Sequence, residues 1–180
     1  EHTNSNSLVD VVFDADALLQ LNGTDQHRLH ISIKNNAEIN LDATCNQSRS
    51  ILEIKDGVFK TNSIELKLHR ILIKPEQAGS SQLFDAGTSN ITLGAAEHVL
   101  EGMHYLDTLS SLDSATFIFA DPTNPGIPQP IVVDFAGLDI QKLTFERPAT
   151  IAGHPKLKDL SLMDGYTYFL EDSIDVRNTI

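Results

Sequence analysis

Acidic and histidine side chains occur in several groups whose spacing could support metal binding. Glu101-x-x-His104 has the spacing that places a carboxylate and an imidazole around one metal ion in di-iron helical bundles, and Glu97 lies four residues earlier. Such bundles need a second copy of the pair on a facing helix, and this chain has one copy. On a helix the three side chains would centre opposite the apolar residues, so we expect a solvated face that binds no metal.

Two clusters of carboxylates are candidates for calcium, the one cofactor that the sequence leaves open. Asp14-x-Asp16 begins like an EF-hand loop, but Leu18 and Leu19 occupy positions where that loop needs an oxygen ligand and a glycine. An irregular calcium site is the alternative, because loops of all-β domains often supply such ligands. The candidate ligands are Asp14, Asp16 and Asp25 in one cluster, and Asp164, Glu171, Asp172 and Asp175 in the other. Solvated carboxylates are the simpler interpretation of both.

Motifs of known catalytic chemistry are absent from the sequence. It contains no Gly-x-Ser-x-Gly elbow, phosphate-binding glycine loop, dinucleotide fingerprint or His-Glu-x-x-His. With 25 Asp and Glu residues, any pair assigned to glycoside hydrolysis would be arbitrary. The single cysteine, Cys45, continues an alternating apolar series, so we predict a buried and unreactive thiol. No catalytic residue is therefore predicted, although a site dispersed over loops is not visible in a sequence.

Three N-x-Ser/Thr acceptors, at Asn22, Asn46 and Asn90, lie in or near predicted turns and strand ends. They would carry glycans if the chain passes through a eukaryotic secretory pathway. Their number is only slightly above the chance expectation for this composition. They nevertheless favour a secreted or cell-surface location.

Length and charge restrict the classes of partner. A chain of 180 residues fits one domain, 1–180, with a core of its own. The net charge of -12 and the scattered basic residues disfavour nucleic acid and anionic membranes. No run of 18 apolar residues is present, so no transmembrane helix is predicted.

Alternation of apolar and polar residues is the clearest structural signal. It covers Leu29 to Ile33, Ala37 to Cys45 and Ile64 to Leu68, and period two indicates strands with one buried face. Alternation of this kind is typical of antiparallel sheets. Further strands are predicted at Val9–Phe13, Ile51–Ile54, Ala115–Ala120, Ile131–Phe135, Gln141–Phe145 and Tyr166–Leu170.

The register of the first two alternating segments predicts a hairpin. A two-residue loop would set apolar against polar residues, whereas a three-residue loop, Lys34 to Asn36, pairs Ile33 with Ala37 and Ile31 with Ile39. Asn36 would then take the left-handed conformation.

Two further local features follow from the spacing of apolar residues. Between Ile64 and Ile73 the apolar parity changes, so we expect a bulge or bend near His69 and Arg70 that lets one strand serve two sheets. From Gly94 to Leu106, apolar residues recur at helical spacing, so we expect one amphipathic helix interrupted by Gly102 that packs through Val99, Leu100 and Met103.

Together these patterns predict a mainly β fold: an antiparallel β-sandwich or jelly-roll-like domain with one short amphipathic helix. A β-solenoid is the alternative, because apolar triplets recur near residues 31, 41, 52 and 66. The function that fits best is a non-catalytic extracellular or surface-displayed domain that mediates binding, adhesion or assembly with a protein or glycan partner, self-association included. The alternatives are a hydrolase with a dispersed loop-borne site and a viral or filament structural subunit.

Overall fold

The computed structural model describes residues 8–20, 28–94, 97–108, 110–120 and 130–178. Within these ranges the chain is mainly strand, with one turn of 3-10 helix, η1 (Met103–Tyr105). In chain order the strands are β1 (Leu8–Phe13), β2 (Ala17–Leu19), β3 (Arg28–Ile33), β4 (Ala37–Leu41), β5 (Cys45–Ile54), β6 (Gly57–Lys60), β7 (Leu66–Ile73), β8 (Gln82–Asp85), β9 (Asn90–Leu93), β10 (Glu97–Glu101), β11 (Thr116–Phe119), β12 (Ile131–Asp134), β13 (Asp139–Phe145), β14 (Ala149–Ala152), β15 (Lys156–Leu162), β16 (Tyr168–Leu170) and β17 (Asp175–Asn178).

The chain winds in successive coils, and each strand pairs in parallel with a strand of the next coil. Val11 pairs with Ile31, Ile31 with Leu52, and Leu52 with Ile71. The repeat of roughly 20 residues is the size of a short structural repeat. All strand pairs between the described residues are parallel.

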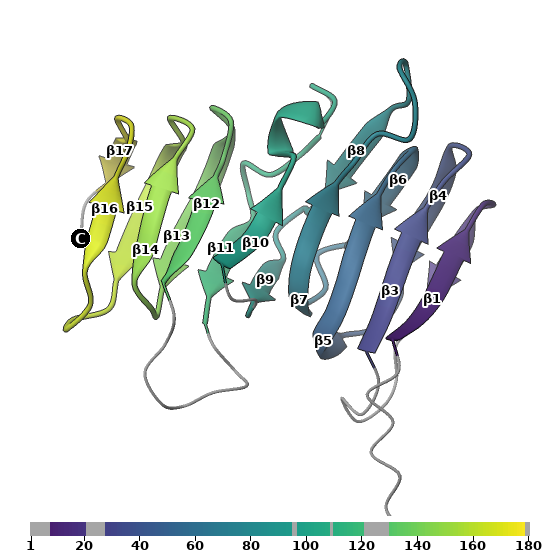
Figure 1. The fold of residues 1–180 in the computed structure, drawn as a ribbon, viewed down its shortest axis with the longest axis horizontal. Helices are drawn as coiled ribbons and strands as arrows, with labels where there is room; N and C mark the ends of the chain where they lie inside the picture. The colour runs from purple at the N-terminus through teal and green to yellow at the C-terminus, as the bar shows by residue number, and fades with distance from the viewer. Residues whose placement is uncertain (1–7, 21–27, 95–96, 109, 121–129, 179–180) are drawn as a thin grey trace, which may run out of the picture.

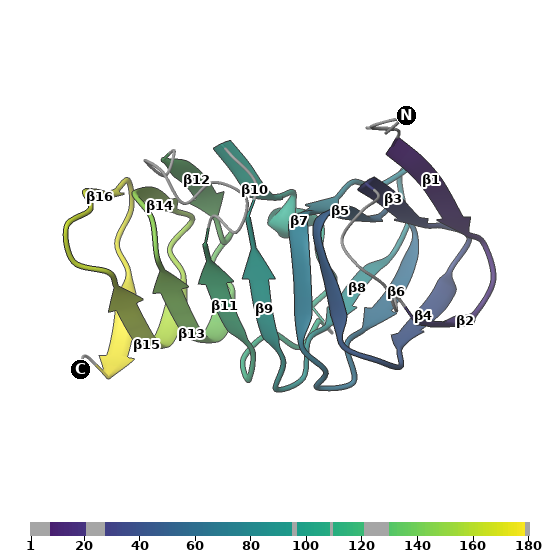
Figure 2. The ribbon, with the colours of Figure 1, turned by 90° about the horizontal axis from the view of Figure 1, so that it is seen from below.

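Figures 1 and 2 show how the coils stack. We call the layer that contains β1, β3, β10, β12, β14 and β16 the front face, and the layer that contains β9, β11, β13, β15 and β17 the back face. Strands β5 and β7 belong to both layers, so the two faces form one sheet of 13 strands that curls like a half-barrel. A separate four-stranded sheet, β2-β4-β6-β8, forms a third side in the N-terminal half.

The antiparallel sandwich is wrong, although alternation located most of the strands. The segment Ala37 to Cys45 is divided, with β4 ending at Leu41 and β5 beginning at Cys45. A strand with one face in a core and one in solvent alternates in the same way whether its neighbours run parallel or antiparallel. Each strand of a coil meets this condition, and β4 alternates between buried and half-buried residues along its whole length. Alternation therefore locates strands but does not set their direction. The direction of the strands is set by the stacking of successive coils, which makes every pair between described strands parallel.

The predicted hairpin between β3 and β4 is also wrong. Ile33 pairs with Phe13 and Ile54, whereas Ala37 pairs with Gly57 in the other sheet. The intervening loop has the predicted three residues, and Asn36 is left-handed, but Asn35 is left-handed as well, with φ values of 57° and 56°. Two consecutive left-handed residues turn the chain onto a new side of the coil, and each strand then finds its partners in neighbouring coils.

The bend predicted near His69 and Arg70 is confirmed, but it connects two faces of one sheet and not two sheets. Leu66 to Leu68 pair with β9 on the back face, while Ile71 and Leu72 pair with β10 on the front face. His69 and Arg70 are both half-buried, between stretches of regular alternation on either side. The change of apolar parity therefore marks the point where one strand passes from one face to the other.

The predicted helix at Gly94 to Leu106 is wrong. This segment contains β10 and η1, and the structure describes no α-helix elsewhere in its ranges. The register of β10 against β12 shifts between His98 and Leu100, which buries Val99 and Leu100 in succession. Gly102 then turns the chain at φ 76° and brings Met103 into the core. A bulge followed by a turn thus gives the apolar spacing of a helix.

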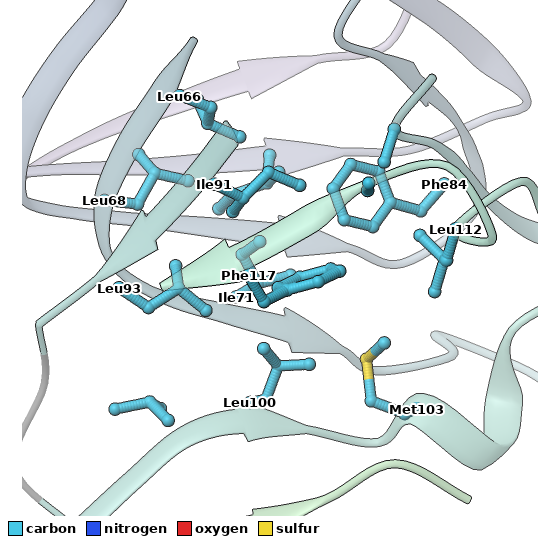
Figure 3. Packing of buried hydrophobic residues seen from close by; sticks show 14 of the residues in the cluster. Leu66, Leu68, Ile71, Phe84, Ile91, Leu93, Leu100, Met103, Leu112 and Phe117 are labelled. Atoms are coloured by element: carbon cyan, nitrogen blue, oxygen red, sulfur yellow. The ribbon is translucent and has the colours of Figure 1, made fainter. Parts of the chain in front are cut away.

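The core lies between the faces and is lined by residues from most coils (Figure 3). Leu100 and Met103 point into it from the front, and Phe117 and Leu93 from the back. Cys45 is fully buried, as the alternation predicted.

Candidate binding surface

The outer side of the front face carries polar side chains aligned across strands. Leu52 and Ile54 of β5 and Ile71 and Ile73 of β7 point into the core. The residue between each pair, Glu53 on β5 and Leu72 on β7, therefore points outward. The pairing sets Glu53 of β5 between Ser32 of β3 and Leu72 of β7, and Leu72 beside Glu101 of β10. Residues far apart in sequence thus form one outward row.

Glu53 is the centre of a compact polar cluster in that row. Its Oε2 atom accepts a hydrogen bond from Ser32 Oγ at 3.1 Å and lies 3.0 Å from Lys55 Nζ and 2.9 Å from His30 Nε2. His30 Nδ1 lies 3.1 Å from Asp10 Oδ1 on the edge strand β1. The Glu53 side chain is only 5% exposed, so its charge is held by these partners and not by bulk water.

The ionisation of Glu53 follows from this environment. Burial alone would raise the pKa of the carboxyl. The hydrogen bond and positive charge of Lys55, the Ser32 hydroxyl and the charge of His30 outweigh burial and hold the pKa below its usual value. Glu53 is therefore a structural carboxylate with every nearby donor directed at it. It is poorly suited to exchange a proton with a substrate.

A hollow of about 640 Å³ opens beside this cluster, where β7, β10 and η1 meet. Its lining residues are Arg70, Leu72, Ile73, Lys74, Glu101, Gly102, His104 and Tyr105. Arg70 Nη2 lies 2.5 Å from Glu101 Oε1 across neighbouring coils. Lys74 is exposed and makes no ion pair with any other described residue. The charged side chains of the hollow therefore sum to a small positive charge.

The turn at η1 places two rings on the surface. Gly102 is left-handed, and an added Cβ there would overlap the carbonyl oxygen of Ile73. Met103 anchors the turn in the core, at 2% exposure, while His104 and Tyr105 are exposed to solvent. Their ring centroids lie 4.0 Å apart, and Tyr105 is 50% exposed. A large side chain held by a buried neighbour yet half in solvent resembles the anchors of binding surfaces.

A second hollow of about 700 Å³ adjoins the first and shares Lys74, His104 and Tyr105 with it. Its other lining residues, Pro75, Gln77, Ala78, Gly79, Ser80 and Gln82, come from the loop between β7 and β8 and the start of β8. We refer to the two hollows together as the η1 groove. The ring pair stands at their junction, so a ligand lying in the groove would cross Tyr105.

The η1 groove contains few groups that could act in acid–base or nucleophilic chemistry. Glu101 is the one carboxylate that lines either hollow, and Arg70 already holds it. Acid–base cleavage of a glycosidic bond needs two carboxylates on either side of the bond. Neither hollow is lined by a cysteine. Ser80, the one serine or threonine that lines either hollow, makes no side-chain hydrogen bond to another described residue, so no base activates its hydroxyl.

The two described residues of the Glu97, Glu101 and His104 group on the front face each have another partner. Glu101 pairs with Arg70, and His104 packs against Tyr105. The side chain of Glu97 lies outside the described residues.

Neither calcium cluster is assembled among the described residues, where no three acidic, histidine or cysteine side chains come close enough to hold a metal ion. Asp16 accepts a hydrogen bond from the backbone N–H of Glu38, and Asp25 lies outside the described residues. In the C-terminal cluster, Asp172 accepts a hydrogen bond from Gly153 N–H and lies 3.3 Å from His154 Nε2. Asp164, Glu171 and Asp175 do not join it around a common point.

Two of the three predicted glycan acceptors have exposed side chains. Asn46 lies on β5 and Asn90 begins β9, and both are exposed to solvent. Asn22 lies outside the described residues. The fold therefore leaves two acceptors open to modification.

Sequence reasoning missed Arg70, Lys74 and Tyr105 as members of a site. The signal that could have found them is the repeat of the coil, which sets β7 beside β10 although 31 residues separate Arg70 from Glu101. Without that pairing, Arg70, Lys74 and Tyr105 lie in no sequence motif.

Within the ranges that the structure describes, no helix is long and apolar enough to cross a bilayer. Comparison with protein-family models, with curated proteins and with solved structures found no match to this chain.

Proposed function

We propose that this chain is a non-catalytic, extracellular or surface-displayed domain that binds a protein or glycan partner in the η1 groove. The observation that carries the proposal is the exposed ring pair of His104 and Tyr105, fixed at the junction of two hollows by the buried Met103. A rigid anchor loses little conformational entropy on binding. The stacked coils supply a stiff support for it.

The charges of the groove define the ligand further. Lys74 has no ionic partner among the described residues, whereas Glu101 and Arg70 satisfy each other. A partner that offers a ring or apolar group to Tyr105 and a carboxylate or hydroxyl to Lys74 matches both features. The exposed acceptors Asn46 and Asn90 support display outside the cell.

The test is a binding screen of the folded chain against panels of glycans and peptides, followed by two matched aromatic variants. Tyr105→Ala removes the anchor, and Phe169→Ala removes another exposed ring on β16, which is 63% exposed against 50% for Tyr105. We expect Tyr105→Ala to weaken the affinity for a selected ligand by roughly tenfold or more, as for an interface hot spot. At protein concentrations where light scattering shows a monomer, Phe169→Ala should leave the affinity unchanged.

Two outcomes would contradict the proposal. Unchanged affinity in Tyr105→Ala, or an equal loss in both variants, would show that binding does not depend specifically on the η1 groove. Turnover of a panel glycan that disappears in Glu101→Gln would establish the hydrolase alternative instead.

Assembly is a second candidate, supported by the C-terminal edge of the sheet. Phe169 and Leu170 on the edge strand β16 are 63% and 59% exposed, and unpaired strand edges promote association. If copies associate there, the mass measured by light scattering should rise with concentration, and Phe169→Lys should abolish the rise. A mass that stays monomeric at all concentrations would contradict assembly.

A further inference from the structure

A row of cations lies on the outer side of the back face, away from the η1 groove. On β13, β15 and β17 the core-facing residues Ile140, Leu157 and Val176 are paired with one another. The next residue of each strand points outward, and these residues are Gln141, Lys158 and Arg177. Lys158 thus stands directly beside Arg177, and both are exposed.

Two like charges in adjacent positions of a sheet repel each other. Neighbouring strands lie about 4.8 Å apart, and like charges directly opposite destabilise the pair. The preceding row shows the usual arrangement, because Lys156 stands between Asp139 and Asp175. Lys158 and Arg177 make no ion pair with any other described residue. Their juxtaposition is therefore unfavourable unless an anion joins them.

The same cations line a hollow of about 410 Å³. Besides Lys156, Lys158 and Arg177, its polar lining consists of Asp113, Asp139 and Gln141. Three cations and two carboxylates leave the hollow positive, although the whole chain carries a net charge of -12. An isolated anionic group would be attracted there, whereas a dense polyanion would meet the acidic surface around it.

The composition of the lining selects among anionic ligands. Asp113, Asp139 and Gln141 offer oxygen atoms that accept hydrogen bonds from hydroxyls, and no aromatic ring lines the hollow. Adjacent ammonium and guanidinium groups can hold the two oxygens of one carboxylate or sulfate. We propose that this hollow binds an acidic sugar unit, with its anionic group between Lys158 and Arg177 and its hydroxyls on Asp113, Asp139 and Gln141.

Isothermal titration with matched oligosaccharides tests this assignment. The acidic probe is a hyaluronan tetrasaccharide, in which glucuronate alternates with N-acetylglucosamine, and the neutral probe is chitotetraose. We expect the acidic probe to bind at least tenfold more tightly, with an affinity that falls as the salt concentration rises. The double variant Lys158→Gln/Arg177→Gln should lose that affinity at least tenfold. Both residues are exposed and repel each other, so without ligand the melting temperature of the double variant should equal or slightly exceed that of the wild type.

The control variant is Lys67→Gln, which removes a lysine on β7 that is paired with Glu65 and lies outside the hollow. It should bind the acidic probe like the wild type. Equal affinity for both tetrasaccharides, or unchanged binding by the double variant, would overturn the proposal. Binding of inorganic sulfate or phosphate as tightly as the tetrasaccharide would also overturn it, because the site would then recognise a free anion and no sugar.

Discussion

Arg70 on β7 contacts Glu101 on β10 at 2.5 Å between Nη2 and Oε1, across 31 residues of sequence. The pair connects two coils at the edge of the η1 groove, and its side chains are 29% and 44% exposed. Exposed pairs contribute about 0.2–1 kcal/mol, because water screens their charges. The pair therefore orients the groove more than it stabilises the fold.

A double-mutant cycle measures that contribution. We expect Arg70→Ala and Glu101→Ala to show a coupling of less than about 1 kcal/mol in the free energy of urea unfolding. A coupling of several kcal/mol would mean that the pair is a main support of the coil stack and would contradict its assignment to the groove.

Met103 should matter far more to stability than its neighbours on η1. At 2% exposure it fills the core beneath the turn, so Met103→Asp would bury an unpaired charge and cost at least about 3 kcal/mol or prevent folding. His104→Asp places the same charge on the exposed adjacent residue and should change the melting temperature little. Comparable melting temperatures for the two variants would show that Met103 does not anchor the turn.

Gly102 permits the close approach of η1 to β7. The steric cost of a side chain at this position can be separated from the cost of its left-handed backbone by comparison with Gly79. Gly102 and Gly79 are both left-handed, at φ 76° and 89°, but an added Cβ overlaps the Ile73 carbonyl at Gly102 and meets nothing within 4 Å at Gly79. Gly79→Ala should cost about 1 kcal/mol from the left-handed backbone alone. Gly102→Ala should cost clearly more in chemical unfolding, and equal costs would show that the turn relaxes away from β7.

The positions of many strands could be predicted from the sequence, whereas the pairing of those strands could not. Alternation located β3, β4 and β7, and the parity change at His69 and Arg70 located the bend, because these signals come from neighbours in sequence. Pairing depends on residues a full coil apart, and no local signal distinguishes a corner at Asn35 and Asn36 from a hairpin turn. For the same reason, the η1 groove and the row of Lys158 and Arg177 could not be predicted.

Cys45 provides a direct probe of coil opening. Its side chain is fully buried, so a thiol reagent can reach it only when the surrounding coils open. We expect labelling of the native protein to be at least about 100-fold slower than labelling in denaturant. Equal rates would show that the buried position is not maintained in solution.

Glu53 should make stability depend on pH in the acid range. Its pKa is lowered in the folded protein, because Lys55, Ser32 and His30 together outweigh the effect of burial. A group whose pKa is lower in the folded state than in the unfolded state stabilises the fold above the unfolded pKa. This stability is lost as the pH falls through the folded value.

We therefore expect Glu53→Gln to be less stable than the wild type at pH 7, since Lys55 loses its ionic partner. The difference in the free energy of unfolding should narrow as the pH falls below the usual glutamate pKa of about 4.3. Urea titrations of both proteins at a series of pH values measure this difference directly. The other carboxylates contribute equally to the pH dependence of both proteins, so their effect cancels in the difference. Ser32→Ala removes one hydrogen-bond donor to the Glu53 carboxylate. In a Ser32→Ala background, the stability lost on Glu53→Gln should therefore be smaller than in the wild type. Parallel stability curves for wild type and Glu53→Gln across the whole range would show that the cluster does not hold the Glu53 charge.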